Sequence, residues 1–313
     1  MEAFDLLVVG GGAAGMAAAA AAAESGASVA LAEREPGLGG ILRQCVHRGF
    51  GRAVFGEEVS GPEFASRLIA RVLASGARVL TGTAVTKLER DRTAMLSGPA
   101  GYFRIGFSRC ILAAGCYERT AASLPVAGTR PAGVFTAGTA QAMINLGHYC
   151  IGSRIVILGS GDVGQIMARQ FVRMGKQVVC LVEQRSAPGG LARNRRDCLE
   201  ACRIPVRLRA TVDEILGAGR VSGVMVRELD TGRRTPVECD TLVTAVGLIP
   251  DRALCRPLAE DGRLPDWLRL GGNCDFVHDM VDNVVKEAAA LGAEAAKGNE
   301  RSNGENGSRA DAF

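Results

Sequence analysis

The chain has 313 residues, 47% of them apolar and 22% charged, and a formal net charge of +4. This length and composition are typical of a soluble protein with about two domains. The 41 glycines follow no Gly-X-Y period, which excludes a collagen-like chain. Acidic and basic residues are interspersed, and no stretch interleaves bases with aromatics, so we expect no nucleic-acid partner. The longest apolar stretch, residues 13–23, is mostly alanine and too short to cross a membrane, so we expect no integral membrane segment.

The first predicted elements are a strand, a glycine turn, a helix and a second strand. Residues 5–9 are a short apolar run bounded by glycines, which predicts a buried parallel strand. An alanine-rich helix extends to about Glu24, and a second apolar run, residues 28–32, ends at Glu33. The spaced glycines of the turn are Gly10, Gly12 and Gly15.

The same order of elements recurs later in the chain. Residues 154–158 are apolar, a helical stretch extends to Met174, and residues 177–182 end at Glu183. Gly159 lies 149 residues after Gly10, and Glu183 lies 150 residues after Glu33. The second turn has its spaced glycines at Gly159, Gly161 and Gly164. This spacing indicates an internal repeat of a whole nucleotide-binding unit.

The remaining elements complete the two units. Residues 110–115 and 241–247 are apolar runs that end in glycine and close the first and second unit. Residues 61–74 have a helical pattern, and residues 206–239 predict a small antiparallel meander. Residues 298–313 are polar and charged and predict a disordered tail.

The cysteines indicate a reducing compartment. Ten cysteines are scattered along the chain and none forms a CxxC pair. We therefore expect reduced, mostly buried cysteines in a cytoplasmic protein, and we predict no metal site.

Each glycine turn has the residues that a dinucleotide pyrophosphate needs. The first glycine allows a tight turn, the second lets the backbone approach the phosphates, and the third lets helix and strand pack closely. The amino end of the following helix offers free N–H groups to the phosphates. Glu33 and Glu183 stand where a carboxylate accepts from a ribose hydroxyl. The alternative interpretation is two structural turns in an α/β fold.

Two such units resemble the two-dinucleotide-binding flavoproteins of the pyridine nucleotide-disulfide oxidoreductase superfamily, in the thioredoxin-reductase-like arrangement. The resemblance extends over residues 4–297. It implies an α/β fold with two Rossmann-like three-layer (ββα) domains, the first for FAD and the second for NAD(H). It implies an FAD-binding domain in residues 1–120 and 246–297 and an inserted NAD(H)-binding domain in residues 121–245. The predicted tail, residues 298–313, follows these domains.

The resemblance also implies which residues contact the cofactors. Asn273 departs from the family, which usually has aspartate there, and so keeps a hydrogen-bonding side chain without the charge. The FAD contacts expected from the resemblance are Gly10, Gly12, Ala13, Ala14, Gly15, Glu33, Arg34, Gly40, Gln44, Val85, Ala114, Gly115, Asn273, Asp275, Met280 and Val281. The expected NAD(H) contacts are Gly159, Gly161, Asp162, Val163, Gly164, Glu183, Gln184 and Gly247.

Three further stretches, residues 39–45, 115–119 and 275–279, resemble a narrower subgroup of this superfamily. Its members are FAD/NAD subunits that accompany glycerol-3-phosphate dehydrogenase, opine oxidase, hydrogen cyanide synthase, dye-linked proline dehydrogenase and sarcosine oxidase. The resemblance implies a partner that is a second flavoprotein dehydrogenase, together with a small iron–sulfur protein.

Candidate catalytic residues are Cys45, His47 and His278, each with an alternative role in packing or surface hydrogen bonding. Disulfide reductases of the superfamily carry a redox cysteine pair, whereas this chain has Cys45 alone in that region. Cys198 and Cys202, four residues apart, are expected on one helix face rather than in a redox loop. The helix after His278 has Asp279 as its expected cap and Asp282 in its first turn. We expect two arginine groups to be mainly solvated: Arg43, Arg48 and Arg52, and Arg193, Arg195 and Arg196.

These observations favour an FAD-dependent oxidoreductase that passes electrons between NAD(H) and another donor or acceptor. Two alternatives stay open. One is an electron-transfer subunit with a vestigial NAD site, and the other is a disulfide or peroxide reductase that uses Cys45. Glu183 predicts a preference for NADH over NADPH, because a carboxylate repels a 2′-phosphate.

Overall fold

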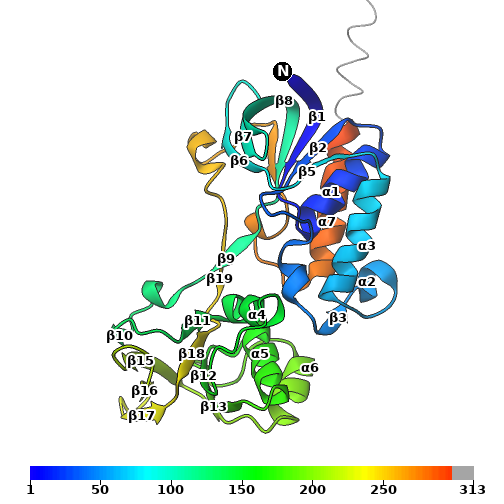
Figure 1. The fold of residues 1–313 in the computed structure, drawn as a ribbon. Helices are drawn as coiled ribbons and strands as arrows, with labels where there is room; N and C mark the ends of the chain where they lie inside the picture. The colour runs from blue at the N-terminus through cyan, green and yellow to red at the C-terminus, as the bar shows by residue number, and fades with distance from the viewer. Residues whose placement is uncertain (298–313) are drawn as a thin grey trace, which may run out of the picture. The chain divides into compact units, whose positions relative to one another are not determined.

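The computed structural model describes residues 1–297 and has two compact units (Figure 1). Unit 1 comprises Met1–Tyr117 and the chain from Ile249 onward, and unit 2 comprises Glu118–Leu248. Unit 2 is therefore an insertion in unit 1. The two connecting strands, β9 (Cys116–Glu118) and β19 (Leu248–Pro250), pair with each other. The predicted tail, residues 298–313, lies outside the described residues.

Unit 1 is built on a sheet of seven strands in the order β5-β2-β1-β8-β7-β6, with β20 also paired to β8. The strands β5, β2, β1 and β8 are parallel neighbours, whereas β6, β7 and β8 form an antiparallel meander. The strands are β1 (Glu2–Val9), β2 (Val29–Ala32), β5 (Arg78–Leu80), β6 (Ala84–Leu88), β7 (Thr93–Gly98), β8 (Gly101–Leu112) and β20 (Leu268–Leu270).

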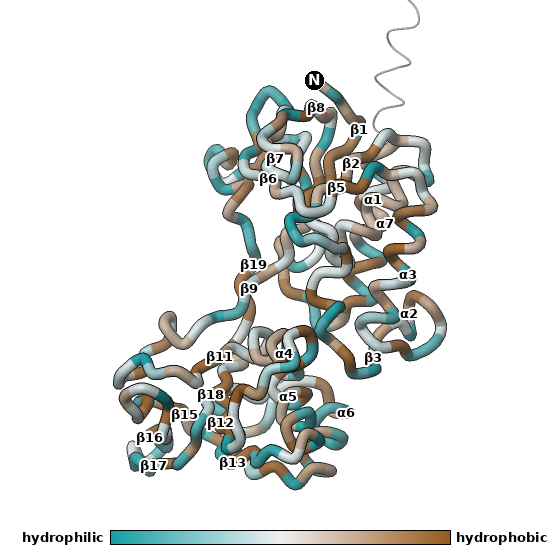
Figure 2. Tube along the Cα trace, viewed as in Figure 1, coloured by the Kyte–Doolittle hydropathy of each residue, from teal (hydrophilic) through white to brown (hydrophobic). Residues whose placement is uncertain are grey.

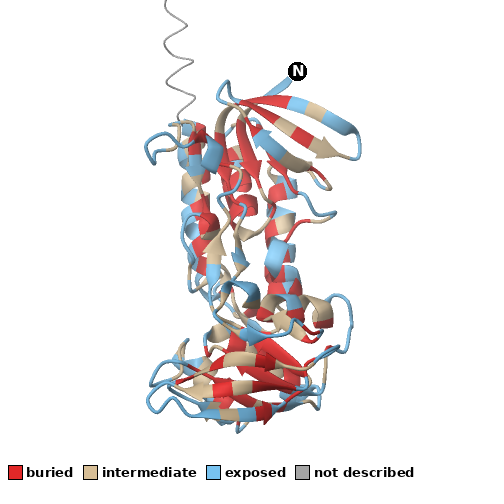
Figure 3. Cartoon of the chain, turned by 90° about the vertical axis from the view of Figure 1, so that its left-hand side faces the viewer, coloured by how far each residue is buried: buried red, intermediate tan, exposed pale blue. Residues whose placement is uncertain are grey.

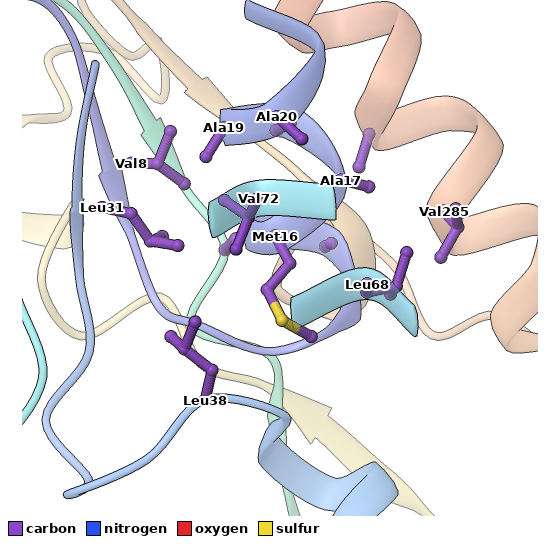
Figure 4. Packing of buried hydrophobic residues seen from close by; sticks show 14 of the residues in the cluster. Val8, Met16, Ala17, Ala19, Ala20, Leu31, Leu38, Leu68, Val72 and Val285 are labelled. Carbon is purple, nitrogen blue, oxygen red and sulfur yellow. The ribbon is translucent and has the colours of Figure 1, made fainter. Parts of the chain in front are cut away.

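Three helices of unit 1 cover one face of the parallel strands: α1 (Ala13–Glu24), α3 (Gly61–Ala74) and α7 (Val281–Lys297) (Figure 1). The alanines of α1 are almost fully buried, because the helix lies between the sheet and the two other helices (Figure 4). Small side chains let the backbones approach closely, and a Cβ on Gly292 of α7 would overlap with the carbonyl oxygen of Ala18.

Several short elements complete unit 1. Ser60 begins α3 with a capping box, in which its backbone N–H donates to Glu63 Oε2 at 2.7 Å. The other elements are η1 (Gly40–Gln44), β3 (Arg48–Phe50), α2 (Arg52–Phe55), β4 (Val59–Ser60), η4 (Arg256–Leu258) and η5 (Gly272–Cys274).

Unit 2 has a parallel sheet in the order β11-β18-β12-β13-β14 and a second sheet in the order β10-β15-β16-β17. One hydrophobic core lies between the two sheets, and another lies between the parallel sheet and its helices. The parallel strands are β11 (Val134–Thr136), β12 (Arg154–Leu158), β13 (Gln177–Val182), β14 (Val206–Arg207) and β18 (Thr241–Thr244). The second sheet holds β10 (Ala127–Gly128), β15 (Ala210–Leu216), β16 (Gly223–Glu228) and β17 (Arg234–Glu238). The helices are η2 (Ala121–Ser123), α4 (Ala137–Asn145), α5 (Asp162–Arg173), α6 (Ala192–Asn194) and η3 (Arg195–Glu200).

The strands β1 and β2 in unit 1 and β12 and β13 in unit 2 consist largely of hydrophobic residues (Figure 2). Most residues of these strands are buried, and Figure 3 shows buried segments in the interior of each unit. Each unit thus has the predicted three-layer arrangement of helices, parallel sheet and antiparallel strands. Within residues 1–297, no helix is long and apolar enough to cross a bilayer.

Two expectations from the sequence are wrong in detail. Residues 206–239 do not form one meander, because β14 pairs in parallel with β13 and only β15, β16 and β17 are antiparallel. Cys198 and Cys202 do not share a helix face, because η3 ends at Glu200 and Cys202 lies in the turn after it.

Candidate dinucleotide-binding sites

The first glycine turn connects β1 to α1 and has three glycines with different constraints. Gly10 has φ +106°, and a Cβ there would overlap with the carbonyl oxygen of Ala113. A Cβ on Gly15 would overlap with the carbonyl oxygen of Gly10, so this glycine lets α1 pack on the turn. A Cβ on Gly12 would have no atom within 4 Å. The structure of unit 1 therefore does not require glycine at position 12, and the space in front of it is free for a ligand.

Glu33 is fixed at the end of β2, beside this turn. Its Oε2 accepts from the backbone N–H of Gly11 at 2.6 Å, and its Oε1 accepts from the backbone N–H of Glu35 at 2.8 Å. The side chain is buried. Two backbone bonds hold the carboxylate in one orientation next to the amino end of α1, as a ribose-binding acid requires.

The second glycine turn, between β12 and α5, repeats this geometry. Gly159 has φ +103° and packs against the carbonyl of Ala245, while a Cβ on Gly164 would lie 2.5 Å from the carbonyl oxygen of Gly159. A Cβ on Gly161 would have no atom within 4 Å. The position that is free in the first turn is thus free in the second.

Glu183 is the counterpart of Glu33 and has one additional partner. Its Oε2 accepts from the backbone N–H of Ser160 at 3.0 Å and from the Ser160 hydroxyl, and its Oε1 accepts from the backbone N–H of Arg185 at 2.9 Å. Burial alone would raise the pKa of Glu183. The hydrogen bonds from Ser160 and Arg185 and the charge of Arg185 outweigh it, so the pKa lies below its ordinary value. Glu183 is therefore a fixed, negatively charged acceptor.

The other residues expected to contact FAD lie in several segments of unit 1. Gly40 comes close to the first turn, since its Cβ would lie 3.1 Å from Gly12 Cα. Gln44 is buried in η1, Val85 packs into the sheet core, and Val281 packs beside α1. Ala13 and Ala14 begin α1, Ala114 and Gly115 follow β8, Arg34 follows Glu33, and Met280 directly precedes α7. Asp275 forms an ion pair with Arg252 at 3.4 Å.

Asn273 and His278 contact each other. Asn273 Oδ1 accepts from the backbone N–H of His278 at 3.1 Å and lies 3.2 Å from His278 Nδ1. His278 Nε2 lies 2.7 Å from Glu287 Oε2, and the ring stacks on Phe276. The backbone N–H of His278 orients the Asn273 amide with its oxygen toward the His278 ring. Both ring nitrogens of His278 therefore face acceptor oxygens, Asn273 Oδ1 and Glu287 Oε2.

Cys45 and His47 each contact a nearby backbone carbonyl group. Burial raises the pKa of the Cys45 thiol to about 12, and the thiol donates to the carbonyl oxygen of Ile41 at 3.3 Å. His47 Nδ1 lies 3.1 Å from the carbonyl oxygen of Arg48, and its ring contacts Phe50. A thiol with this pKa is a poor nucleophile at neutral pH.

The first turn of α7 has a role that differs from the expected one. The helix begins at Val281, so Met280 rather than Asp279 occupies the position before it. Asp282 lies in the first turn as expected, but its buried carboxylate accepts from three backbone N–H groups at the start of α2. These N–H groups belong to Gly51, Ala53 and Val54, at 2.9–3.2 Å.

The remaining residues expected to contact NAD(H) surround the second turn. Val163 and Gln184 are exposed, and Gly247 has φ +110° with open space where a Cβ would be. Asp162 begins α5, and its carboxylate accepts from the backbone N–H of Leu191 at 2.8 Å and from the Asn194 amide at 2.7 Å. Its side chain therefore contacts a neighbouring loop.

The structure adds one feature that the sequence interpretation missed. Gly189 and Gly190 lie against the second turn, as Gly39 and Gly40 lie against the first. The repeat offset of 150 residues, applied beyond the acids, matches Gly39-Gly40 to Gly189-Gly190, so the signal was present in the sequence. Each site thus combines a glycine turn, an acid and a double glycine. This set fits a dinucleotide, with a free space for the pyrophosphate and an acceptor for the ribose.

The chain is 28% identical over 190 residues to an opine oxidase subunit of Rhizobium meliloti (strain 1021), and the match covers 60% of this chain and 40% of that protein. The match thus spans less than half of the length of this relative.

Solved structures show the same fold. Thioredoxin reductase of T. acidophilum matches with a TM-score of 0.78 and 21% identity over 96% of this chain and 100% of that chain. A NAD-dependent persulfide reductase from A. fulgidus matches with a TM-score of 0.68 and 20% identity over 93% of this chain and 58% of the other. L-proline dehydrogenase from P. horikoshii matches with a TM-score of 0.64 and 17% identity over 95% of this chain and 56% of that chain. The family profile described as pyridine nucleotide-disulphide oxidoreductase matches residues 4–264. The chain therefore belongs to the pyridine nucleotide-disulphide oxidoreductase family.

Proposed function

We propose that this protein is an FAD-dependent oxidoreductase that passes electrons between NAD(H) and a partner or acceptor. The family implies the use of FAD and NAD(P)H. The observation that carries the proposal is the pair of glycine turns, each with one unobstructed glycine and one fixed carboxylate.

In this proposal unit 1 binds FAD and unit 2 binds NAD(H). The free space at Gly12 and the amino end of α1 receive the FAD pyrophosphate, and Glu33 accepts from a ribose hydroxyl. Gly161 and Glu183 do the same for the nicotinamide nucleotide. FAD supplies a carrier that takes two electrons from a nicotinamide and can pass them on singly. The protein's own part is to bind and orient, and no side chain of the chain is required as a general acid or base.

The proposed nicotinamide cofactor is NADH rather than NADPH. Glu183 is negatively charged and fixed by Ser160 and Arg185, so it accepts from a 2′-hydroxyl and repels a 2′-phosphate. The positive charge of Arg185 beside it opposes this preference. Anaerobic stopped-flow reduction of the flavin by each nucleotide decides the matter, and equal or faster reduction by NADPH would overturn the assignment.

We further propose that the protein works within a multi-subunit flavoprotein dehydrogenase. The similarity to a subunit of opine oxidase supports this proposal. The proposed partner is a second flavoprotein dehydrogenase, with a small iron–sulfur protein. Co-expression with proteins encoded beside it should yield a stable complex. Full turnover of a small metabolite by the isolated chain would contradict the proposal.

The central experiment is an anaerobic titration of the purified protein with NADH. The proposed function predicts a yellow protein whose flavin is bleached by NADH alone. A yellow protein that NADH does not bleach would favour an electron-transfer subunit with a vestigial NAD site. Activity with a disulfide or peroxide substrate that is lost in Cys45→Ser would favour the reductase alternative. The high pKa of Cys45 argues against that last outcome.

A further inference from the structure

The segment of residues 186–194, here called the strap, lies against the second glycine turn and is fastened to it by three polar side chains. The backbone N–H of Gly189 donates to Ser160 Oγ at 2.8 Å, and Gln165 Nε2 donates to the carbonyl oxygen of Gly189 at 2.6 Å. Asp162 Oδ1 accepts from the backbone N–H of Leu191 and from the Asn194 amide. The contact is close, because a Cβ on Gly190 would lie 2.6 Å from Asp162 Oδ1.

The counterpart of the strap in unit 1 is fastened in a different way. The offset of 149 residues between the two glycine turns matches Ser160, Asp162 and Gln165 to Gly11, Ala13 and Met16, none of which has a side chain that can make these hydrogen bonds. Instead, Gly39 N donates to the carbonyl oxygen of Gly11 at 2.9 Å. Leu38 and Leu42 are buried in the main hydrophobic core of unit 1.

The strap of unit 2 has no such apolar anchor among the described residues. Pro188 stands at the position of Leu38, and the exposed Ala192 stands at the position of Leu42; neither belongs to a core cluster of unit 2. A segment held by a few partly exposed hydrogen bonds opens at a much lower free energy than one anchored in a core. The strap of unit 2 is therefore expected to open more easily than its counterpart in unit 1.

A second observation points to a ligand or solvent group at the same junction. Gln165 is fully buried, and its Oε1 has no hydrogen-bond partner within residues 1–297. Its Nε2 is held between the carbonyl oxygens of Ser160 and Gly189, so the amide cannot turn to satisfy Oε1. A buried acceptor of this kind calls for a donor that the described chain does not supply.

We propose that the strap is a movable wall of the nicotinamide-nucleotide site, latched by Asp162, and that it opens to exchange the nucleotide. Its counterpart in unit 1 stays closed on a cofactor that is not exchanged. This inference rests on the proposed function. Asp162 is in this view a positioning residue, because its carboxylate acts through Leu191 and Asn194.

The test combines hydrogen exchange at the Leu191 amide with NADH binding, measured by NADH fluorescence under anaerobic conditions with the flavin already reduced. The proteins compared are wild type, Asp162→Ala, Asp162→Asn and Glu200→Ala. NADH should slow exchange at Leu191 in wild type at least tenfold. Asp162→Ala should speed this exchange at least tenfold without nucleotide and weaken NADH binding at least tenfold. Asp162→Asn keeps the acceptor Oδ1 and should restore most of the slow exchange at Leu191 and most of the NADH affinity. Glu200 is exposed, and Glu200→Ala should match wild type. Each variant should keep wild-type flavin content, which shows that unit 1 is folded.

Two negative outcomes are distinguishable. Wild type that binds neither NADH nor NADPH would overturn both the proposed function and the movable wall. Normal NADH binding in Asp162→Ala, or strap exchange that NADH does not change, would overturn the movable wall alone and leave the nucleotide site in place. Asp162→Asn behaving as Asp162→Ala would show that the charge acts directly rather than through the strap.

Discussion

Gly12 and Gly15 belong to one motif, yet their substitution should damage different properties. Gly12 has φ −78° and ψ −170°, which any residue adopts, and a Cβ there would meet no atom within 4 Å. Gly12→Val should therefore change the free energy of unfolding of the apoprotein by less than about 1 kcal/mol. Its side chain fills the space proposed for the pyrophosphate, and FAD affinity should fall at least about 100-fold, or about 2.8 kcal/mol.

Gly15→Ala should instead destabilise unit 1. Its Cβ would overlap with the carbonyl oxygen of Gly10 and lie 2.9 Å from the carbonyl carbon, and both belong to the backbone. Overpacking that moves backbone costs about 3 kcal/mol. For a unit of this size that lowers the melting temperature by about 6–12 °C.

The assay pairs thermal melting of the apoproteins with the flavin-to-protein ratio after reconstitution and gel filtration. Gly12→Val should melt like wild type and remain colourless. Gly15→Ala should melt earlier. A stoichiometric flavin spectrum in Gly12→Val would show that the first turn does not bind FAD. A destabilised Gly12→Val apoprotein would show that the space in front of this glycine is not free.

Four further predictions concern titratable groups. Because burial raises the pKa of Cys45 from 9.0 to about 12, its alkylation at pH 8 should be roughly a thousandfold slower than that of an ordinary thiol. The exposed Cys150, whose pKa the Lys176 ammonium lowers, should react first; peptide mass spectrometry measures both. Cys45→Ser should keep NADH-to-dye activity within about tenfold, because Cys45 is not expected to carry electrons as half of a disulfide. If wild type consumes two NADH equivalents per flavin in an anaerobic titration and Cys45→Ser consumes one, this expectation is wrong. Asp282→Ala should lower the free energy of unfolding by about 3 kcal/mol, because it leaves one buried and two partly buried N–H groups at the start of α2 without their acceptor; an unchanged melting temperature would refute this. The pKa of Glu183 is lowered in the folded state, so its stabilising contribution is present above about pH 4.5 and declines as the pH falls. Glu183→Gln should flatten this part of the acid-unfolding curve, and an unchanged curve would refute the role of the charge.

The elements with strong local signals could be predicted from the sequence. The spaced glycines and the acids at the ends of β2 and β13 identify both turns, and the helix of α3 has the predicted bounds of residues 61–74. The short strand β14 could not be separated from the meander, because two residues carry no periodicity.

Long-range polar contacts could not be predicted from local pattern. Asp282 accepts from backbone N–H groups about 230 residues earlier in the chain, and no spacing rule connects such positions. The raised pKa of Cys45 depends on the packing around it, which only the folded chain determines. The double glycine at residues 189–190 is an intermediate case. It lies 150 residues after Gly39-Gly40, so the repeat predicts it once the comparison of the two units is extended beyond the acids.

The insertion of unit 2 into unit 1 has a consequence for how the protein is made. A ribosome releases the chain from the amino end, and domains generally fold as units during synthesis. The sequence of unit 2 is complete at Leu248, whereas β20 and α7 of unit 1 follow it. The part of α1 that packs against α7 therefore emerges early and stays uncovered until α7 arrives. The inserted unit should reach its native state first during translation, and the nascent chain should need protection of α1 from aggregation until residue 297 has left the ribosome.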